Sequence, residues 1–434
     1  MNRILDASLL DGPLPWVLIA AGAAGGIVLL AVSSRRWWTR LVPLVLVAAV
    51  LFAAGAALVV DRVWRPFPDP LPVSALVAAG VVLAAIGLAV AGFGRRGGPG
   101  RVGSVVAVVA VLAAAAQSMN GVYREYPTVR TVLGLPAADQ VPFTDVPLQA
   151  PLVPARAGRP LAQVWRAPAG MPQAGVVTQV DIPGTGSGFV ARPALVYLPP
   201  SYLTSPRAQL PVLVLMAGQP GSPQDWVDAG MLAARMDAYA AVHDGLAPVV
   251  VVVDHLGAPL SNPLCMDSRL GQVATYLAVD VPAWIRATLQ VDRDPAAWAI
   301  GGLSSGGTCS LQMAVNAPQV YPTFVAISGE SEPTLGDRAS TVAAAFGGDA
   351  ASFTAVNPLD VLTTRRFPGT AGFLVAGQQD PQYLPQARQL LGACRAAGMD
   401  VQLQILPGGH TWQVWGPGLT AALPWLGTRL GLTE

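Results

Sequence analysis

The segment from Gly302 to Gly307, GLSSGG, places a serine where the chain can turn sharply from a strand into a helix. It fits the pattern G-x-S-x-G, whose tight turn requires small flanking residues and raises one serine side chain above a sheet edge. Ser304 occupies the nucleophile position. The alternative is a serine that merely caps the following helix. The segment therefore predicts nucleophilic chemistry only if a base and an acid accompany it.

A serine hydroxyl needs a general base, and the three histidines of the chain are the candidates. In this class of site the order along the chain is serine, acid, histidine. His410, in GGHTW after the last predicted strand, satisfies this order, whereas His243 and His255 precede Ser304. His255 follows a predicted strand, so we expect it to line the substrate cleft, to lie at the surface, or to support residues of the site from behind. We predict that His410 is the base.

The acid that orients the histidine should follow a strand between Ser304 and His410. Asp380 in AGQQD meets this condition, 76 residues after the serine and 30 before the histidine. As an isolated residue it is also typical of a solvated turn before a proline. The competing acids are Glu330, Glu332 and Asp360.

An oxyanion hole requires two backbone N–H groups directed at the developing negative charge. The residue after the nucleophile, Ser305, is expected to supply one of them. The second is expected from the loop 217–221, which follows an early predicted strand. Gln219 is the favoured donor there, because Pro220 has no N–H and Gly218 lets the backbone turn.

Short β-branched runs that alternate with helical segments surround these residues, which predicts an α/β domain with a mostly parallel sheet covered on both faces. The predicted strands are 193–200, 210–218, 248–254, 297–303, 323–328, 372–376 and 401–406. The predicted helices are 223–242, 271–289, 306–317, 383–397 and 411–429.

Four uncharged apolar runs, each of 17 to 23 residues, precede this domain. At about 1.5 Å per residue they match a hydrocarbon core of about 30 Å, so they predict an all-α bundle of four transmembrane helices. A cleaved signal peptide is the alternative for the first run, but the residues before it are not basic. The runs are 15–34, 41–60, 71–93 and 102–118.

The charges between the runs predict the orientation of the bundle. The first and third connections are rich in arginine, whereas the charges of the second cancel, so the positive-inside rule places the first and third in the cytoplasm. We therefore expect a multi-pass plasma-membrane protein whose N-terminus and catalytic domain lie outside the cytoplasm. The charged residues are Arg35, Arg36 and Arg40, then Asp61, Arg62, Arg65 and Asp69, then Arg95, Arg96 and Arg101.

The composition agrees with two domains of different character. Of 434 residues, 53% are hydrophobic and 12% are charged, which excludes a disordered chain. The net charge of +1 argues against nucleic acid as a partner, because binding a duplex requires a clustered positive field. We predict a transmembrane domain over 1–121, a proline-rich extracytoplasmic connector over 122–173 and a catalytic domain over 174–434.

The segments that carry the predicted chemistry resemble the putative-esterase family of α/β hydrolases, which includes esterase D and the antigen-85-type mycolyltransferases. The resemblance covers about residues 176–428 and implies an α/β-hydrolase fold. It further implies Ser304, Asp380 and His410 as a triad, with Gln219 and Ser305 as oxyanion donors. The mycolyltransferases have Glu where this chain has Asp380, a departure toward ordinary esterases. The matching segments are RPALVYLPPSY (192–202), MAGQPGSPQDW (216–226), GLSSGG (302–307), GQQD (377–380) and GGHTWQVWG (408–416).

Cysteines and tryptophans complete the candidate residues. We predict a disulfide between Cys265 and Cys309, because both lie in the outward half and near the nucleophile helix, and a free buried Cys394. The cysteines have no metal-binding spacing, so we expect neither a metal nor a cofactor. The aromatic candidates for a substrate cleft, each of which is alternatively a core residue, are Trp226, Trp412 and Trp415.

These residues predict a membrane-anchored serine esterase or acyltransferase that acts on acyl esters of the cell envelope, such as lipids or glycolipids. The alternative from a different class is a catalytically silent envelope protein that kept the fold to bind a partner protein or lipid. A peptidase with the same triad is a third hypothesis. The sequence specifies no protein partner.

Overall fold

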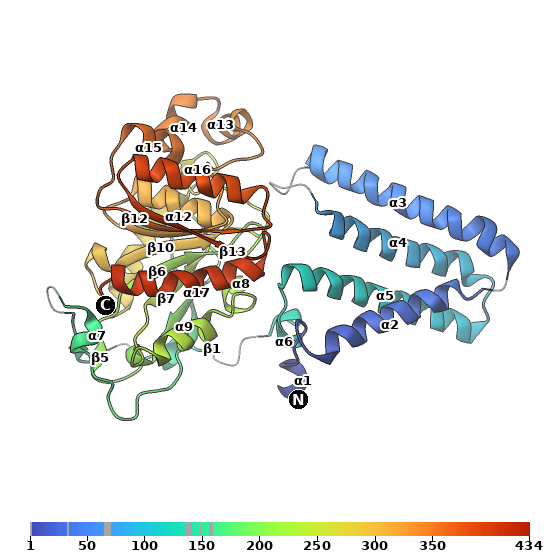
Figure 1. Cartoon of the computed structure of the whole chain (residues 1–434), viewed down its shortest axis with the longest axis horizontal. Coiled ribbons are helices and arrows are strands. Elements are labelled where there is room, and N and C mark those ends of the chain that lie inside the picture. The colour runs from blue at the N-terminus through green and yellow to red at the C-terminus, as the bar shows by residue number, and fades with distance from the viewer. Residues whose placement is uncertain (1, 33, 65–70, 136–139, 148, 156–158) are drawn as a thin grey trace. The chain divides into compact units, whose positions relative to one another are not determined.

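Two units follow one another along the chain, residues 1–136 and 137–434 (Figure 1). The predicted loop residues Arg65 and Asp69 lie outside the part of the chain that is described. The computed structural model describes residues 2–32, 34–64, 71–135, 140–147, 149–155 and 159–434.

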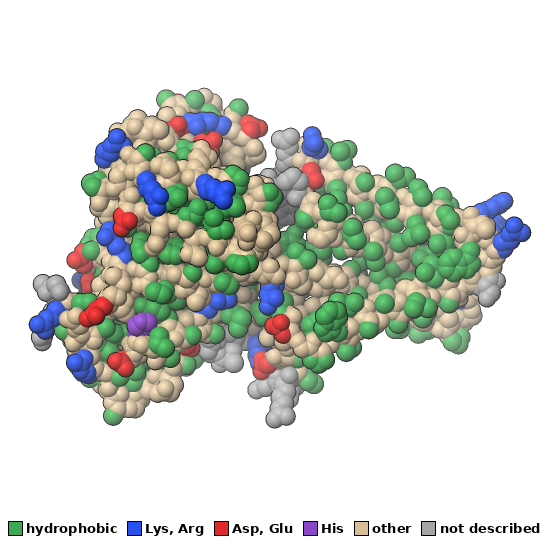
Figure 2. Space-filling model, viewed as in Figure 1, with side chains coloured by type: hydrophobic (Ala, Val, Ile, Leu, Met, Phe, Trp, Pro, Cys, Tyr) green, Lys and Arg blue, Asp and Glu red, His purple; other side chains and the backbone are tan. Residues whose placement is uncertain are grey.

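The first unit is a bundle of helices. Within its described residues, four helical segments are long and apolar enough to cross a membrane, as predicted. Apolar side chains cover the visible face of these helices and charged side chains lie toward their ends (Figure 2). The four segments are α2 (Pro13–Leu30), α3 (Val42–Val59) with its flanking turns η1 (Trp37–Leu41) and η2 (Val60–Trp64), α4 (Val73–Phe93) and α5 (Gly98–Tyr123).

Small residues allow α2 and α5 to pack closely. A Cβ atom added at Gly22 would lie 2.2 Å from the Cβ of Ala114, and one added at Gly25 would lie 2.7 Å from the carbonyl oxygen of Ala107. Helices in an apolar solvent associate through such close packing, because lipid provides no hydrophobic driving force between them. The short helices α1 (Asn2–Leu5) and α6 (Val129–Val132) complete this unit.

The second unit is built around a nine-stranded sheet. Its order is β1-β3-β4-β7-β6-β10-β11-β12-β13, and all neighbours are parallel except that β4 is antiparallel to β3 and β7. Its central strands are buried, as their unbroken apolar runs predict. The strands are β1 (Gln140–Val141), β3 (Val176–Val180), β4 (Ala194–Leu198), β6 (Val212–Met216), β7 (Val249–Val253), β10 (Trp298–Leu303), β11 (Thr323–Ile327), β12 (Ala371–Gly377) and β13 (Asp400–Leu406).

Helices cover both faces of the sheet (Figure 1). On one face lie α12 (Ser305–Asn316) and α16 (Tyr383–Ala396), and on the other lie α9 (Leu232–Ala241) and α17 (Trp412–Arg429). The seven predicted strands and the predicted helices 306–317, 383–397 and 411–429 are confirmed, and with them the α/β-hydrolase fold.

Two predicted helices are interrupted. The first, 223–242, consists of α8 (Gln224–Val227) and α9, because Met231 between them has a left-handed conformation with φ 48°. The second, 271–289, begins as a strand. It comprises β9 (Gly271–Gln272), which pairs with β8 (Asp267–Ser268), then α10 (Val273–Thr275), the π-helical η5 (Tyr276–Asp280) and α11 (Val281–Thr288). The pattern also missed three helices late in the chain, α13 (Arg338–Phe346), α14 (Ala350–Val356) and α15 (Pro358–Thr364).

The predicted connector 122–173 is not a separate spacer. Beyond the boundary at 136/137 it belongs to the second unit, where β1 pairs with β3. Leu161 of α7 (Leu161–Val164) and Trp165 are each only 1% exposed in the core. Prolines break the periodicity of this segment, so its buried apolar residues produce no helical or strand pattern. The remaining short elements are η3 (Phe143–Asp145), η4 (Pro200–Tyr202), η6 (Pro295–Ala297), and β2 (Leu152–Val153) paired with β5 (Arg207–Ala208).

Candidate active site

A single residue, Ser304, makes the turn between β10 and α12. Its backbone has φ 51° and ψ −119°, a strained conformation for a residue with a side chain. The turn requires glycine on both sides. A Cβ atom at Gly302 would lie 2.5 Å from the carbonyl carbon of Gly306, and one at Gly306 would lie 2.4 Å from the carbonyl oxygen of Ala217. The sharp turn predicted from the G-x-S-x-G pattern is therefore present.

Two hydrogen bonds connect Ser304 through His410 to Asp380. The Nε2 atom of His410 lies 3.0 Å from Oγ of Ser304, and its Nδ1 atom lies 3.1 Å from Oδ2 of Asp380. The Asp380 side chain is 2% exposed and that of His410 is 25% exposed. A carboxylate accepts only, so it favours the tautomer with the proton on Nδ1 and leaves Nε2 free to accept the serine proton.

Neighbouring strands bring the acid and the histidine together. Asp380 and His410 lie on the loops that follow β12 and β13, which pair along their whole length. The backbone N–H of Gln379 donates to the carbonyl of Gly408 at 2.9 Å, and the Gly408 N–H donates to the Gln379 side chain at 2.5 Å. Asp380 also accepts from the backbone N–H of Tyr383 at the start of α16 at 3.0 Å. These bonds hold the two loops in register.

Two of the competing acids have other partners. Glu332 accepts hydrogen bonds from Arg338 at 3.0 Å and from Asn357 at 2.9 Å. Asp360 also accepts from Arg338, and from Asn357 at 2.8 Å. These carboxylates join helices of the segment 338–364, whereas Asp380 faces His410.

Aromatic rings hold the imidazole of His410 from two sides. The ring of Tyr383 stacks on it with centroids 4.0 Å apart, and that of Trp415 meets it edge-on at 5.0 Å. Trp412 packs between Trp415 and Trp226, 5.3 Å from each. Sequence reasoning missed Tyr383, because a ring contact of this kind depends on how α16 packs against the sheet.

The three tryptophans are too buried to line a cleft, so the alternative that they are core residues holds. Trp226 is fully buried and donates from its indole N–H to the carbonyl of Met216 at 2.8 Å, while Trp412 is 5% exposed. Trp415, at 9%, contacts the His410 ring. The cluster is therefore core that supports the histidine.

The loop 217–221 passes directly beside Ser304. A Cβ atom added at Gly218 would lie 3.3 Å from the Cβ of Ser304, and the N–H of Gly306 donates to the carbonyl of Ala217 at 3.0 Å. The side chain of Gln219 donates to the carbonyl of Leu260 at 3.3 Å. Of the two predicted oxyanion donors, Ser305 thus directly follows the serine, and Gln219 directly follows Gly218, which lies beside it.

The other two histidines lie in different surroundings. His243 bonds the carbonyl of Tyr239 at 2.7 Å and stacks on its ring. His255 is 2% exposed and lies 3.1 Å from Oγ of Ser305, so it is buried beside the site rather than at the surface. Burial lowers the pKa of His255 to about 4, which keeps this imidazole neutral at physiological pH.

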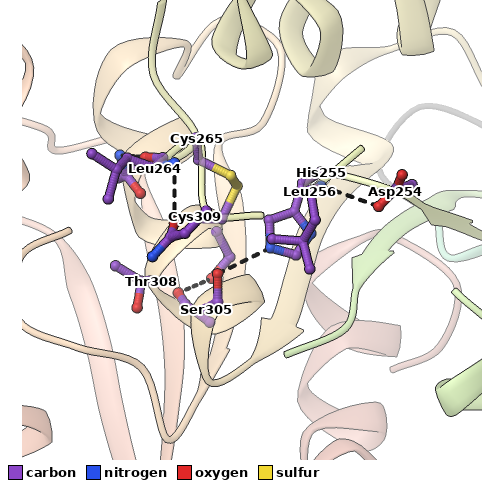
Figure 3. The surroundings of a disulfide bond; sticks show 12 residues. Asp254, His255, Leu256, Leu264, Cys265, Ser305, Thr308 and Cys309 are labelled. Carbon is purple, nitrogen blue, oxygen red and sulfur yellow. Dashed lines mark hydrogen bonds between the residues drawn. A yellow bond between two sulfur atoms is a disulfide. The ribbon is translucent and has the colours of Figure 1, made fainter. Parts of the chain in front are cut away.

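A disulfide joins Cys265 to Cys309 on α12, which is the predicted pairing, and Cys394 is free and buried. Burial raises the pKa of the Cys394 thiol to about 12, so this thiol is unreactive. Figure 3 shows the disulfide beside His255 and Ser305.

Replacing Cys265 and Cys309 together by serine is expected to lower the free energy of unfolding by about 2–4 kcal/mol, because the bond constrains the unfolded chain. Thermal unfolding of the full chain in detergent measures the effect, with Cys394→Ala as a control that keeps the bond. Reductant should lower the unfolding transition of the wild type toward that of the double variant. An unshifted transition after both thiols have been shown to be free would contradict this expectation.

The sheet, the serine turn and the covering helices define an α/β hydrolase. Residues 191–426, more than half of the chain, match the putative-esterase family. The chain therefore belongs to that family, a hydrolase family of the esterase type.

Individual relatives agree with this assignment. An uncharacterized protein of Corynebacterium glutamicum is 36% identical over 399 residues, which cover 89% of each chain and so extend into both units. In structure the chain is similar to a ferulic acid esterase (TM-score 0.51, 19% identity, 59% of this chain and 99% of that one). It is also similar to an S-formylglutathione hydrolase from Agrobacterium tumefaciens (TM-score 0.50, 17% identity, 60% and 97%). At these identities the structural likeness concerns the fold.

Proposed function

We propose that the chain is a membrane-anchored serine esterase or acyltransferase that acts on acyl esters of the cell envelope. The observation that carries this proposal is the relay from Ser304 through His410 to Asp380, with both hydrogen-bond distances near 3 Å. A serine that only capped a helix would not require a buried carboxylate aligned behind a histidine.

The geometry supports an acyl-enzyme mechanism. Ser304 Oγ attacks the ester carbonyl while Nε2 of His410 takes its proton, and Asp380 stabilises the imidazolium. The N–H groups of Ser305 and Gln219 bind the tetrahedral oxyanion. His410 then returns the proton to the leaving alcohol, and the acyl group remains on Ser304.

The second half-reaction reverses these steps with a new acceptor. Water, or a hydroxyl of a sugar or lipid, loses its proton to His410 and attacks the acyl group, which regenerates Ser304. Hydrolysis and transfer therefore use the same residues and differ only in which acceptor reaches the acyl-enzyme.

The proposed location rests on the four apolar helical segments and on the charges between them. Arg95 and Arg96 lie between α4 and α5, and Arg35 and Arg36 lie between α2 and α3. Arg101, predicted to lie in the same connection as Arg95, is instead in the first turn of α5. The positive-inside rule assigns both connections to the cytoplasm, so the chain after α5 lies outside. We accordingly propose a multi-pass plasma-membrane protein whose hydrolase unit faces the envelope.

Labelling with a fluorophosphonate, which reacts only with an activated serine, tests the proposal. Full-length wild type in detergent is expected to label, and Ser304→Ala is expected not to label. Ser340→Ala, which alters an exposed serine of α13, is the matched control and should label like the wild type. Folded wild-type protein that fails to label would overturn the proposal and favour a catalytically silent protein that binds a partner or lipid.

A further inference from the structure

One loop covers one face of the nucleophile helix. The loop 254–266 follows β7 and contacts α12 through three side chains that are four and then three residues apart, the spacing of one helix face. The contacts join Ser305 Oγ to His255 Nε2 at 3.1 Å and Cys309 to Cys265 by the disulfide (Figure 3). The third joins the Gln312 side-chain amide to the Leu264 carbonyl at 2.8 Å.

The first of these contacts involves the residue that follows the nucleophile. In Figure 3 the His255 ring and the Ser305 side chain point toward one another. His255 is 2% exposed, so water does not compete strongly for this hydrogen bond. The ring is neutral, and the bond therefore carries no buried net charge.

His255 is itself held by the residue before it. The Asp254 carboxylate accepts from the backbone N–H groups of Leu256 at 3.1 Å and Gly257 at 3.0 Å, which closes a tight turn around His255. The same carboxylate binds the guanidinium of Arg192 at 2.7 Å. These bonds fix the backbone of the turn from which the His255 ring projects.

Arg192 extends this arrangement to the other predicted oxyanion donor. Its Nη2 atom donates to the carbonyl of Gly221 at 2.8 Å, at the end of the loop that contains Gln219. Asp254 and His255 therefore connect, by separate hydrogen bonds, to both segments that supply the proposed oxyanion hole. The strand order β7-β6-β10 places these segments side by side.

We propose that His255 is a positioning residue that acts through the hydroxyl of Ser305 to align the backbone N–H of Ser305 with the oxyanion. The inference rests on the proposed function. The turn at Ser304 is strained, and the bond from His255 holds the first turn of α12 together with the bond from the Gly306 N–H to the Ala217 carbonyl at 3.0 Å. Misalignment would weaken binding of the transition state more than binding of the ground-state ester.

His255→Ala in the full chain is expected to lower kcat for a soluble short-chain ester about 10- to 100-fold, less than loss of an oxyanion donor, with KM nearly unchanged. Ser305→Ala should have the same effect, and the double variant should be no worse than either single one, because all three remove one hydrogen bond. His243→Ala, a histidine outside the site, is the matched control and should retain wild-type kcat.

Two further measurements separate positioning from a merely structural role. The inhibition constant of a boronic acid, which forms a tetrahedral adduct on Ser304, should rise in parallel with the loss of kcat. His255→Gln, whose side-chain amide also bonds a hydroxyl, should recover part of kcat. A variant that is less stable but has normal kcat and inhibition constant would overturn the proposal.

The outcomes remain distinguishable if a variant fails to fold. Ser305→Ala leaves the buried ring in place, and wild-type kcat in that variant would overturn the role of His255 even if His255→Ala could not be purified. Failure of the wild type to label with fluorophosphonate refutes the proposed function instead. If the wild type labels and His255→Ala retains wild-type kcat, only this inference is refuted.

Discussion

His410→Ala is expected to lower kcat for ester hydrolysis by about 10⁴- to 10⁶-fold. The reason is that Ser304 then has no base at 3.0 Å to accept its proton and no acid to protonate the leaving alcohol. The rate that remains would come from the oxyanion donors and from substrate binding alone.

Steady-state kinetics with a soluble ester, together with the rate of fluorophosphonate labelling, measures this loss. Both should fall in His410→Ala, while thermal unfolding confirms that the protein is folded. His243→Ala should behave as the wild type, because its imidazole bonds the Tyr239 carbonyl at the end of α9. A His410→Ala variant within tenfold of wild-type kcat would refute the assignment of the base.

Asp380→Asn is expected to lower kcat by about 10⁴-fold, although the side chain keeps its size. The amide would donate to Nδ1 of His410, which places the imidazole proton on Nε2, where it blocks transfer from Ser304. Asp380→Glu should retain more activity than Asp380→Asn, because a carboxylate remains to accept from the imidazole. The ratio of kcat between the two variants is the quantity to measure.

Glu332→Gln is the matched control for Asp380→Asn, because both changes convert a carboxylate into an amide. Glu332 bonds Arg338 and Asn357, so its replacement should affect stability more than kcat. If Glu332→Gln lost as much activity as Asp380→Asn, the choice of acid would be wrong.

The main strands of the hydrolase unit could be predicted because burial on both faces leaves an unbroken apolar run, as in the five valines of β7. Strand β3 has the mixed sequence VVTQV, with partly exposed residues, and was missed for that reason. The prediction of a separate connector over 122–173 was wrong for another reason. Its prolines removed every periodic signal, while Leu161 and Trp165 are buried by contacts distant in sequence.

The residues of the candidate site were accessible to sequence reasoning to different degrees. The turn at Ser304 depends on its own glycines, so local sequence determines it. The assignments of His410 and Asp380 followed from the order serine, acid, histidine along the chain. The support of His410 by Tyr383 and Trp415 could not be predicted, because ring packing depends on how α16 and α17 approach the sheet.

The sequence by itself thus determined the two kinds of domain, the serine turn and the chemical identity of the candidate triad, since each is encoded in residue types over a short stretch. Only the tertiary structure decided which side chains meet. The contact of His255 with Ser305 spans 50 residues and depends on the strand order β7-β6-β10, which departs from chain order. Long-range pairing of this kind is set by the burial of the whole sheet, and a local pattern therefore cannot specify it.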